Sequence, residues 1–191
     1  MQQTQKKLKI LITTDLYATN TNGVVTSVQN LFDELTAKGH DVKILTISAN
    51  LHSRREGAVT YIRSVSLDKF YPNVRMPVSY RHELIRDLID WKPDVVHSQC
   101  EFFSYQFALY ISKKTGAPII HTYHTMYEDY VHYITHGYFD RSSKRIVEYL
   151  TLFYCDKTIS ELIVPTKKAY ELFKEKREKL LDLIKYKNEG K

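Results

Sequence analysis

Short apolar runs alternate along this chain with segments whose apolar residues recur every three or four positions. The apolar runs predict strands at 7–14, 40–47, 59–65, 92–98, 117–123 and 161–166. The periodic segments predict helices at 24–39, 79–91, 106–116 and 141–155, with a final helix from 166 onward. Strands that alternate with helices are typical of a parallel sheet with helices on both faces. Such sheets bury their strands, which explains strands that are apolar throughout. We therefore expect an α/β fold.

The bulk properties narrow the class of protein further. A chain of 191 residues, 43% of them hydrophobic, is long enough for one domain with a buried core. No stretch approaches the ~18 continuous apolar residues that a membrane span needs, and the first residues lack the apolar block of a signal peptide. Cys100 and Cys155 form neither a zinc pattern nor a disulfide framework, which favours a reducing cytoplasm. The net charge of +6 favours anionic partners such as phosphates, nucleic acid or an acidic membrane.

The first candidate site is the loop from Asp15 to Gly23, because open parallel sheets bind ligands at the carboxyl ends of their strands. The six glycines are too scattered to form a G-x-G-x-x-G fingerprint, which argues against a dinucleotide. Asn22, Gly23 and Val24 nevertheless open the first helix directly, and the free N–H groups at a helix start attract phosphate. A plain Asn-Gly connecting turn explains the same residues equally well, so both interpretations stay open.

The second candidate site is the stretch HTYHTMYEDYVHYITHGYF, which holds four of the eight histidines. One set of its side chains recurs every four residues: His124, Glu128, His132 and His136. Such spacing can put metal ligands on one helical face, but each step overshoots a turn by about 40°, and we expect no metal. His121 and His124 end a predicted strand, where a histidine can orient or accept a proton. Bonding to the backbone within the core is the alternative. Without a nucleic-acid-binding motif, the interleaved tyrosines indicate a wet surface rather than a nucleic-acid site.

Four motifs taken together resemble family 4 glycosyltransferases of the GT-B fold, and most of all bacterial diacylglycerol glucosyltransferases. They are DLYATNTNGVVTSVQNL, GHDVKILT, PDVVHSQ and HTYHTMYEDYVHY. The resemblance covers about Lys9 to Phe173, and YHTMYEDY is its most specific part. It implies a Rossmann-like amino-terminal half that binds the acceptor, and a carboxyl-terminal half that holds most of the nucleotide sugar. It also implies retaining transfer, with UDP-glucose as the expected donor, a lipid such as diacylglycerol as acceptor, and no required cofactor.

The resemblance implies roles for particular residues. His124 is the expected catalytic residue. The expected donor-binding residues are Asn22, Gly23 and Val24, and the expected acceptor-binding residues are Tyr127, Glu128 and Asp129. Members that act on lipids sit on acidic membranes, which implies a peripheral location on the cytoplasmic face of the cell membrane. The membrane candidates are Lys69, Phe70, Tyr71, Arg75, Met76, Tyr80, Arg81, Arg141, Lys144 and Arg145. A solvated face is the alternative for these basic residues.

The chain departs from the family after VPTKKAYELFKEK, where members continue into a linker and a second domain. We predict a domain at 1–173 and a helix at 174–191, either joined after deletion of the donor domain or simply overlong. The chain alone is expected to be catalytically incomplete, because the leaving diphosphate needs stabilising donors that it lacks. Two alternatives stay open. One is a stand-alone module that binds anionic membranes or phosphate ligands, and the other is a complete small enzyme with His124 as base.

Overall fold

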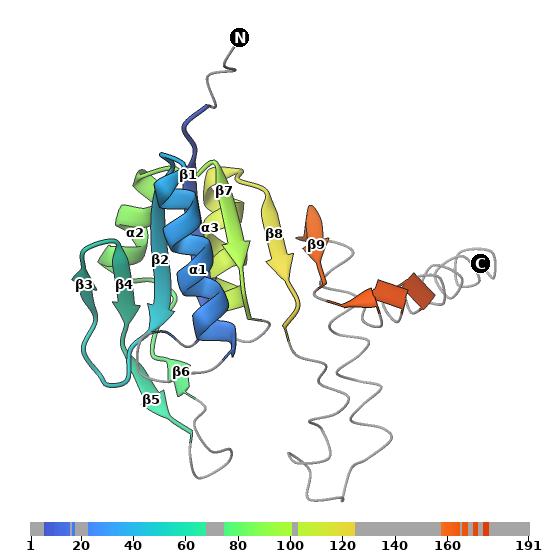
Figure 1. The fold of residues 1–191 in the computed structure, drawn as a ribbon. Coiled ribbons are helices and arrows are strands. Elements are labelled where there is room, and N and C mark those ends of the chain that lie inside the picture. Colours follow the sequence, from blue (N-terminus) through green and yellow to red (C-terminus); the bar gives the residue numbers. More distant parts are fainter. Residues whose placement is uncertain are drawn as a thin grey trace, which may run out of the picture. The chain divides into compact units, whose positions relative to one another are not determined.

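The computed structural model describes residues 6–15, 17, 23–67, 75–100, 103–124, 158–164, 166–167, 170–171 and 174–175. The chain divides into two compact units, Met1–Thr122 and Tyr123–Lys191, and each is considered by itself (Figure 1). The helix predicted at 141–155 lies outside the described residues. The domain boundary predicted at residue 173 falls within the second unit and stays a prediction.

A mostly parallel sheet forms the centre of the first unit, as the alternating pattern predicted. Its strands are β1 (Lys9–Thr14), β2 (Asp41–Ile47), β3 (Arg54–Glu56), β4 (Val59–Ile62), β7 (Val95–Ser98) and β8 (Ile119–Thr122). They lie side by side in the order β3-β4-β2-β1-β7-β8. All neighbouring pairs are parallel except β3 and β4, which are antiparallel at the edge. The expected Rossmann-like α/β fold is therefore confirmed, and the carboxyl ends of five parallel strands meet at one edge.

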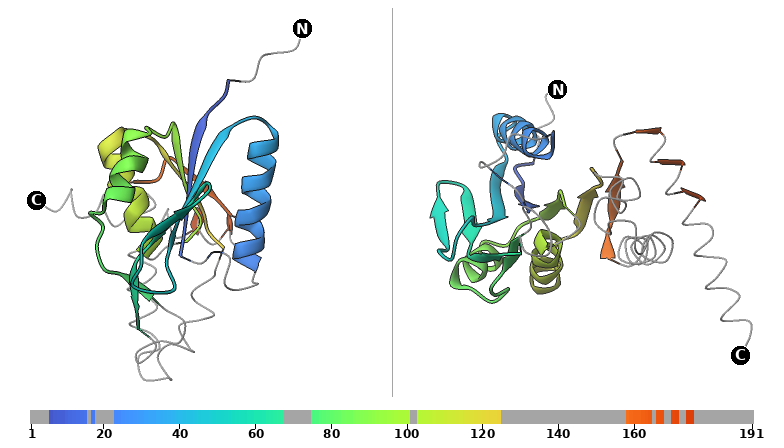
Figure 2. Two further views of the ribbon diagram at one scale, coloured as in Figure 1. Left: turned by 90° about the vertical axis from the view of Figure 1, so that its left-hand side faces the viewer. Right: turned by 90° about the horizontal axis from the view of Figure 1, so that it is seen from below.

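Helices cover both faces of this sheet (Figure 2). Helix α1 (Gly23–Ala37) covers one face, and α2 (Glu83–Asp90) and α3 (Phe103–Thr115) cover the other. Helix α3 ends just before Gly116, whose φ of 77° lies in the left-handed region that glycine adopts without strain. Helix α2 begins after His82, whose ring Nδ1 accepts a hydrogen bond from the Leu84 amide at 3.2 Å. Helix boundaries thus follow from local capping chemistry.

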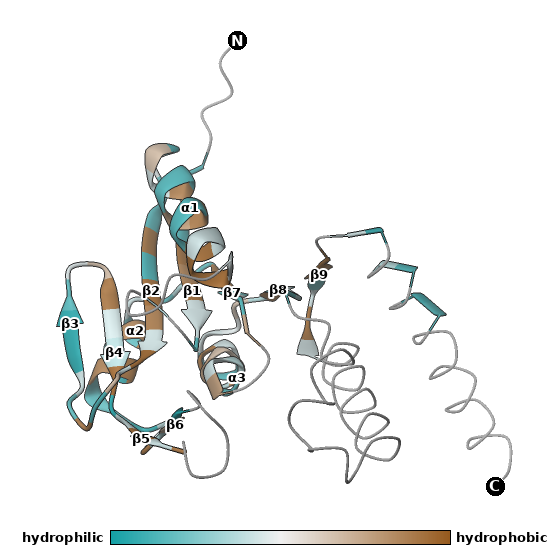
Figure 3. Ribbon diagram, turned by 60° about the horizontal axis from the view of Figure 1, so that its bottom comes forward, coloured by the Kyte–Doolittle hydropathy of each residue, from teal (hydrophilic) through white to brown (hydrophobic). Residues whose placement is uncertain are grey.

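Apolar side chains fill both layers between sheet and helices. The layer beneath α1 is built from Ile10, Ile12, Val28, Val42 and Ile44. Fully buried side chains elsewhere in the core include Leu11, Leu45, Ile85, Leu88, Phe107, Ile111 and Ile119. The edge strand β3 is hydrophilic whereas its neighbour β4 carries hydrophobic residues (Figure 3), which suits an edge that solvent reaches.

The prediction of a single strand at 59–65 was wrong about where that strand ends. The chain leaves the main sheet at Arg63, whose amide donates to the Ser53 hydroxyl at 3.0 Å. Residues Ser64–Ser66 then form β5, which pairs antiparallel with β6 (Arg75–Pro77) in a separate two-stranded sheet. Neither β3 nor β6 was predicted, because strands of three residues are too short to show a periodic pattern.

The second unit contains the strand β9 (Glu161–Ile163), which lies within the run predicted at 161–166. In this unit the Tyr123 amide donates to the Ile163 carbonyl at 2.9 Å.

Among the residues that the structure describes, no helix is long and apolar enough to cross a bilayer. The same residues contain no group of three or more His, Cys, Asp or Glu side chains arranged to hold a metal ion.

Candidate functional site

Polar side chains collect where the parallel strands of the first unit end. The buried ones are Thr13, Thr14, Thr46, Ser48, Ser64, His97, Ser98, Gln99, His121 and Thr122. Burying polar groups costs free energy unless they are hydrogen-bonded. Core packing by itself therefore does not explain why so many buried polar side chains lie at one edge of the sheet. In open parallel sheets the carboxyl edge is also where ligands bind. We therefore treat this edge as the candidate site.

Asp15 follows β1 directly and connects it to helix α3. Its carboxylate Oδ1 accepts a hydrogen bond from the Ser104 amide, in the first turn of α3, at 2.6 Å. A side-chain oxygen in this position satisfies one of the free N–H groups of a helix start. Burial, and then the negative charge of Asp15, raise the pKa of the Tyr80 hydroxyl. Asp15 therefore organises the edge around α3, a role that the sequence analysis missed because its partner is 89 positions away.

Replacing Asp15 by alanine is expected to lower the free energy of unfolding by about 1–2 kcal/mol, because the Ser104 amide loses its acceptor. Asp15→Asn keeps an oxygen acceptor and should cost less. Asp15→Asn should also lower the pKa of Tyr80 toward its ordinary value, because it removes the nearby negative charge. Urea unfolding measures the first effect and an NMR titration of Tyr80 the second. An unchanged Tyr80 titration would contradict the proposed electrostatic contact.

Helix α1 begins at Gly23, at the end of the first loop. Gly23 is exposed, and a Cβ atom added there would meet nothing within 4 Å, so its backbone is open to a ligand. The side chain of Val24 packs against the core beneath α1. Tyr17 packs against the same core, and its hydroxyl donates to Gln29 Oε1 at 2.5 Å. The loop that precedes α1 is thus attached to the helix at Tyr17.

Strands β7 and β8 share a buried polar cluster. The ring Nε2 of His97 lies 2.8 Å from the hydroxyl of Thr122, and the Gln99 side-chain amide donates to the same hydroxyl at 3.5 Å. His121 is buried, and its ring meets the Tyr105 ring edge-on with 5.5 Å between centroids. His121 is therefore a core residue, and its predicted bonding to the backbone stays a prediction.

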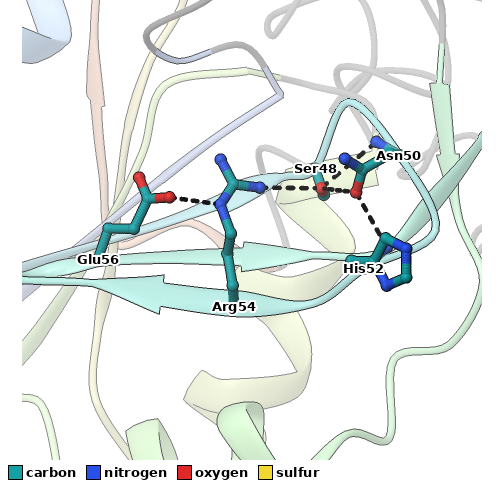
Figure 4. A network of polar contacts seen from close by, with 5 residues as sticks. All are labelled: Ser48, Asn50, His52, Arg54 and Glu56. Carbon is teal, nitrogen blue, oxygen red and sulfur yellow. Dashed lines mark hydrogen bonds and ion pairs between the residues drawn. The ribbon is translucent and has the colours of Figure 1, made fainter.

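Polar contacts cross-link the loop after β2 to strand β3 (Figure 4). Asn50 Oδ1 accepts a hydrogen bond from the Ser48 hydroxyl and another from the His52 amide, each at 3.0 Å. Arg54 donates to the Ser48 hydroxyl at 3.2 Å and to the Glu56 carboxylate at 2.5 Å. Arg54 thus has a structural role at this corner of the sheet.

The predicted site residues are distributed as follows. His124 belongs to the second unit and is partly buried. Among the membrane candidates, Met76 and Arg81 are exposed, whereas Arg75 and Tyr80 are partly buried. The Tyr80 ring lies 4.7 Å, between centroids, from the Phe107 ring. The residues outside the described ranges are Asn22, Lys69, Phe70, Tyr71, Tyr127, Glu128, Asp129, Arg141, Lys144 and Arg145. Their roles stay predictions.

The class of protein follows from the parallel sheet together with the family comparison. Residues 21–178 match the model of Glycosyltransferase Family 4. The chain belongs to this family, which confirms the resemblance seen in its motifs. At family level the chain is therefore a transferase.

The chain is similar to two proteins named alpha-monoglucosyldiacylglycerol synthase. The one from Streptococcus pneumoniae (strain ATCC BAA-255 / R6) is 35% identical over 146 residues, which are 75% of this chain and 32% of the relative. The one from Acholeplasma laidlawii is 32% identical over 169 residues, which are 86% of this chain and 42% of the relative. The chain therefore spans less than half the length of these relatives.

Proposed function

We propose that this chain is the acceptor-binding part of a retaining glycosyltransferase that transfers glucose from a nucleotide sugar to a lipid such as diacylglycerol. The similarity to two monoglucosyldiacylglycerol synthases, over three quarters or more of this chain, carries the proposal. The polar carboxyl edge of the parallel sheet supports it, because ligands of open parallel sheets bind at that edge.

In this proposal the donor is UDP-glucose, and its phosphates bind beside the start of α1. Free N–H groups and the helix dipole attract negative charge there, and the backbone at Gly23 is open. Val24 would contribute its amide, because its side chain is packed in the core. Asn22 completes the donor loop.

The acceptor side of the proposed reaction uses residues of the specific motif. His124 is the proposed catalytic residue, which orients or accepts the proton of the acceptor hydroxyl. Tyr127, Glu128 and Asp129 are proposed to shape the acceptor site. We expect the 191 residues by themselves not to complete the reaction, because the leaving diphosphate needs further donors from a second half.

A split-enzyme assay tests this proposal. Transfer of labelled glucose from UDP-glucose to diacylglycerol in vesicles is measured for this chain, for a separately produced carboxyl-terminal half of the Acholeplasma laidlawii relative, and for their mixture. We expect transfer by the mixture and no transfer by either half when it is tested separately. A mixture that associates but stays inactive would contradict the proposal. Transfer by this chain alone, lost in His124→Ala, would instead favour a complete small enzyme.

We further propose that this domain binds the anionic cytoplasmic face of the cell membrane as a peripheral protein. The net charge of +6 supports this, since each basic residue near such a surface contributes about 1 kcal/mol. The chain is expected to float with anionic vesicles at low salt, to dissociate at high salt, and not to float with neutral vesicles. Vesicle binding combined with an inactive mixture would favour the alternative of a binding module without catalysis.

A further inference from the structure

A network of side-chain hydrogen bonds attaches the segment after β1 to helix α1. The ring of Tyr17 packs against the core beneath α1. Its hydroxyl donates to Gln29 Oε1 at 2.5 Å, and Gln29 Nε2 donates to Asp33 Oδ1 at 2.9 Å. Gln29 and Asp33 are four positions apart on α1, so their side chains are neighbours on its surface. The three side chains therefore form one continuous network.

Asp33 determines which way the side-chain amide of Gln29 faces. An ionised carboxylate only accepts hydrogen bonds, so the NH2 group of Gln29 faces Asp33 and its carbonyl oxygen faces Tyr17. That oxygen needs a donor. Burial, and then Tyr61 and Asp33, raise the pKa of the Tyr17 hydroxyl, which therefore keeps its proton at neutral pH and can donate it. Asp33 thus sets the direction of both hydrogen bonds.

This network lies next to the proposed donor site. Helix α1 begins at Gly23, at the edge of the sheet toward which the parallel strands point (Figure 1). Five residues, 18–22, separate Gly23 from Tyr17. The chain is therefore attached on both sides of them, by the hydrogen bond to Gln29 and by the first turn of α1. A segment attached at both ends has fewer conformations to lose when a ligand binds beside it, and this favours binding.

We propose that Tyr17 and Gln29 are positioning residues for the nucleotide-sugar donor, because their hydrogen bond holds the chain that leads into α1, where the donor phosphates bind. This inference rests on the proposed function and adds two residues to its donor site. The Tyr17 hydroxyl gives its one proton to Gln29, so its contribution to donor binding is indirect. A merely structural role would change stability without a selective change in donor affinity.

Titration of the 191-residue chain with UDP tests the inference, with the amide signals of Gly23 and Val24 followed by NMR. UDP carries the diphosphate of the proposed donor. Tyr17→Phe keeps the packed ring and removes only the hydroxyl, and it is expected to weaken UDP binding about fivefold. Gln29→Met removes the acceptor and should weaken binding to the same extent. Both changes together should weaken it no further, because they remove the same contact.

Two variants serve as controls. The double variant Gln29→Glu, Asp33→Asn exchanges the amide and the carboxylate between the two positions. It keeps the net charge, the pairing along α1 and an acceptor for the Tyr17 hydroxyl, so it should bind UDP like the unaltered chain. Tyr110→Phe removes a hydroxyl from α3, on the opposite face of the sheet, and should also leave UDP binding unchanged.

The split-enzyme assay supplies a second readout. Tyr17→Phe is expected to raise the KM for UDP-glucose and to leave kcat unchanged, because the contact acts equally in the ground state and the transition state. The KM for diacylglycerol should also stay the same. A fall in kcat without a change in the KM for UDP-glucose would contradict the positioning role.

The outcomes separate this inference from the proposed transfer reaction. UDP binding by Tyr17→Phe equal to that of the unaltered chain would overturn the positioning role, and so would an equal loss in Tyr110→Phe. If the Gly23 and Val24 signals of the unaltered chain do not respond to UDP, the donor site and this inference are both overturned, while the split-enzyme assay still decides the transfer reaction. If urea unfolding shows that Tyr17→Phe does not fold, Gln29→Met provides the same test.

Discussion

Replacing His124 by alanine is expected to lower glucose transfer by the mixed halves at least about a hundredfold. A positioned acid or base contributes about 10²–10⁴-fold to a rate, and alanine can neither hold nor accept a proton. The loss should appear mainly in kcat, because a group that acts on the proton in the transition state contributes little to ground-state binding. Initial rates at varied diacylglycerol and UDP-glucose concentrations separate kcat from KM.

His52→Ala is a suitable control for this experiment. His52 is exposed in the loop after β2, and its hydrogen bond to Asn50 Oδ1 uses the backbone amide, which alanine retains. This variant should keep full activity. A His124→Ala enzyme that retains most of its kcat, or that changes only the KM for one substrate, would contradict a catalytic role for His124.

Replacing Phe107 by alanine is expected to lower the free energy of unfolding by about 3–5 kcal/mol. Among the residues that the structure describes, Phe107 has the largest fully buried side chain, and it lies on α3 against the Tyr80 ring. Removing it leaves a cavity and exposes Tyr80, so the pKa of the Tyr80 hydroxyl should also fall, because burial is the main cause that raises it. Urea unfolding followed by circular dichroism measures the stability change.

Two further variants on the same helix make this measurement interpretable. Phe107→Leu keeps most of the buried volume and should cost clearly less. Gln106→Ala, at an exposed position of α3, should change stability by less than about 0.5 kcal/mol. A Phe107→Ala chain as stable as the Gln106→Ala chain would contradict the packing of α3 against the sheet.

The class of fold was predictable because its pattern is local. Alternating apolar runs and periodic segments predicted the parallel strands and the three helices that the structure describes in the first unit, apart from their exact ends. The motifs around Gly23 and His124 also led to the correct family. Short strands such as β3 and β6 were not predictable, because three residues form them only when a neighbouring strand is already in place.

The sequence by itself therefore determined the α/β class and the family. Only the tertiary structure decided which residues pair with one another. It joined Asp15 to the Ser104 amide across 89 positions, and it directed Arg75 to Ser48 and Ser64. The physical reason is that sequence patterns are local, whereas these contacts join residues far apart in the sequence. Periodicity reports which face of an element is buried, whereas a hydrogen bond between distant residues depends on strand order and register. Those quantities are set by the packing of the whole unit.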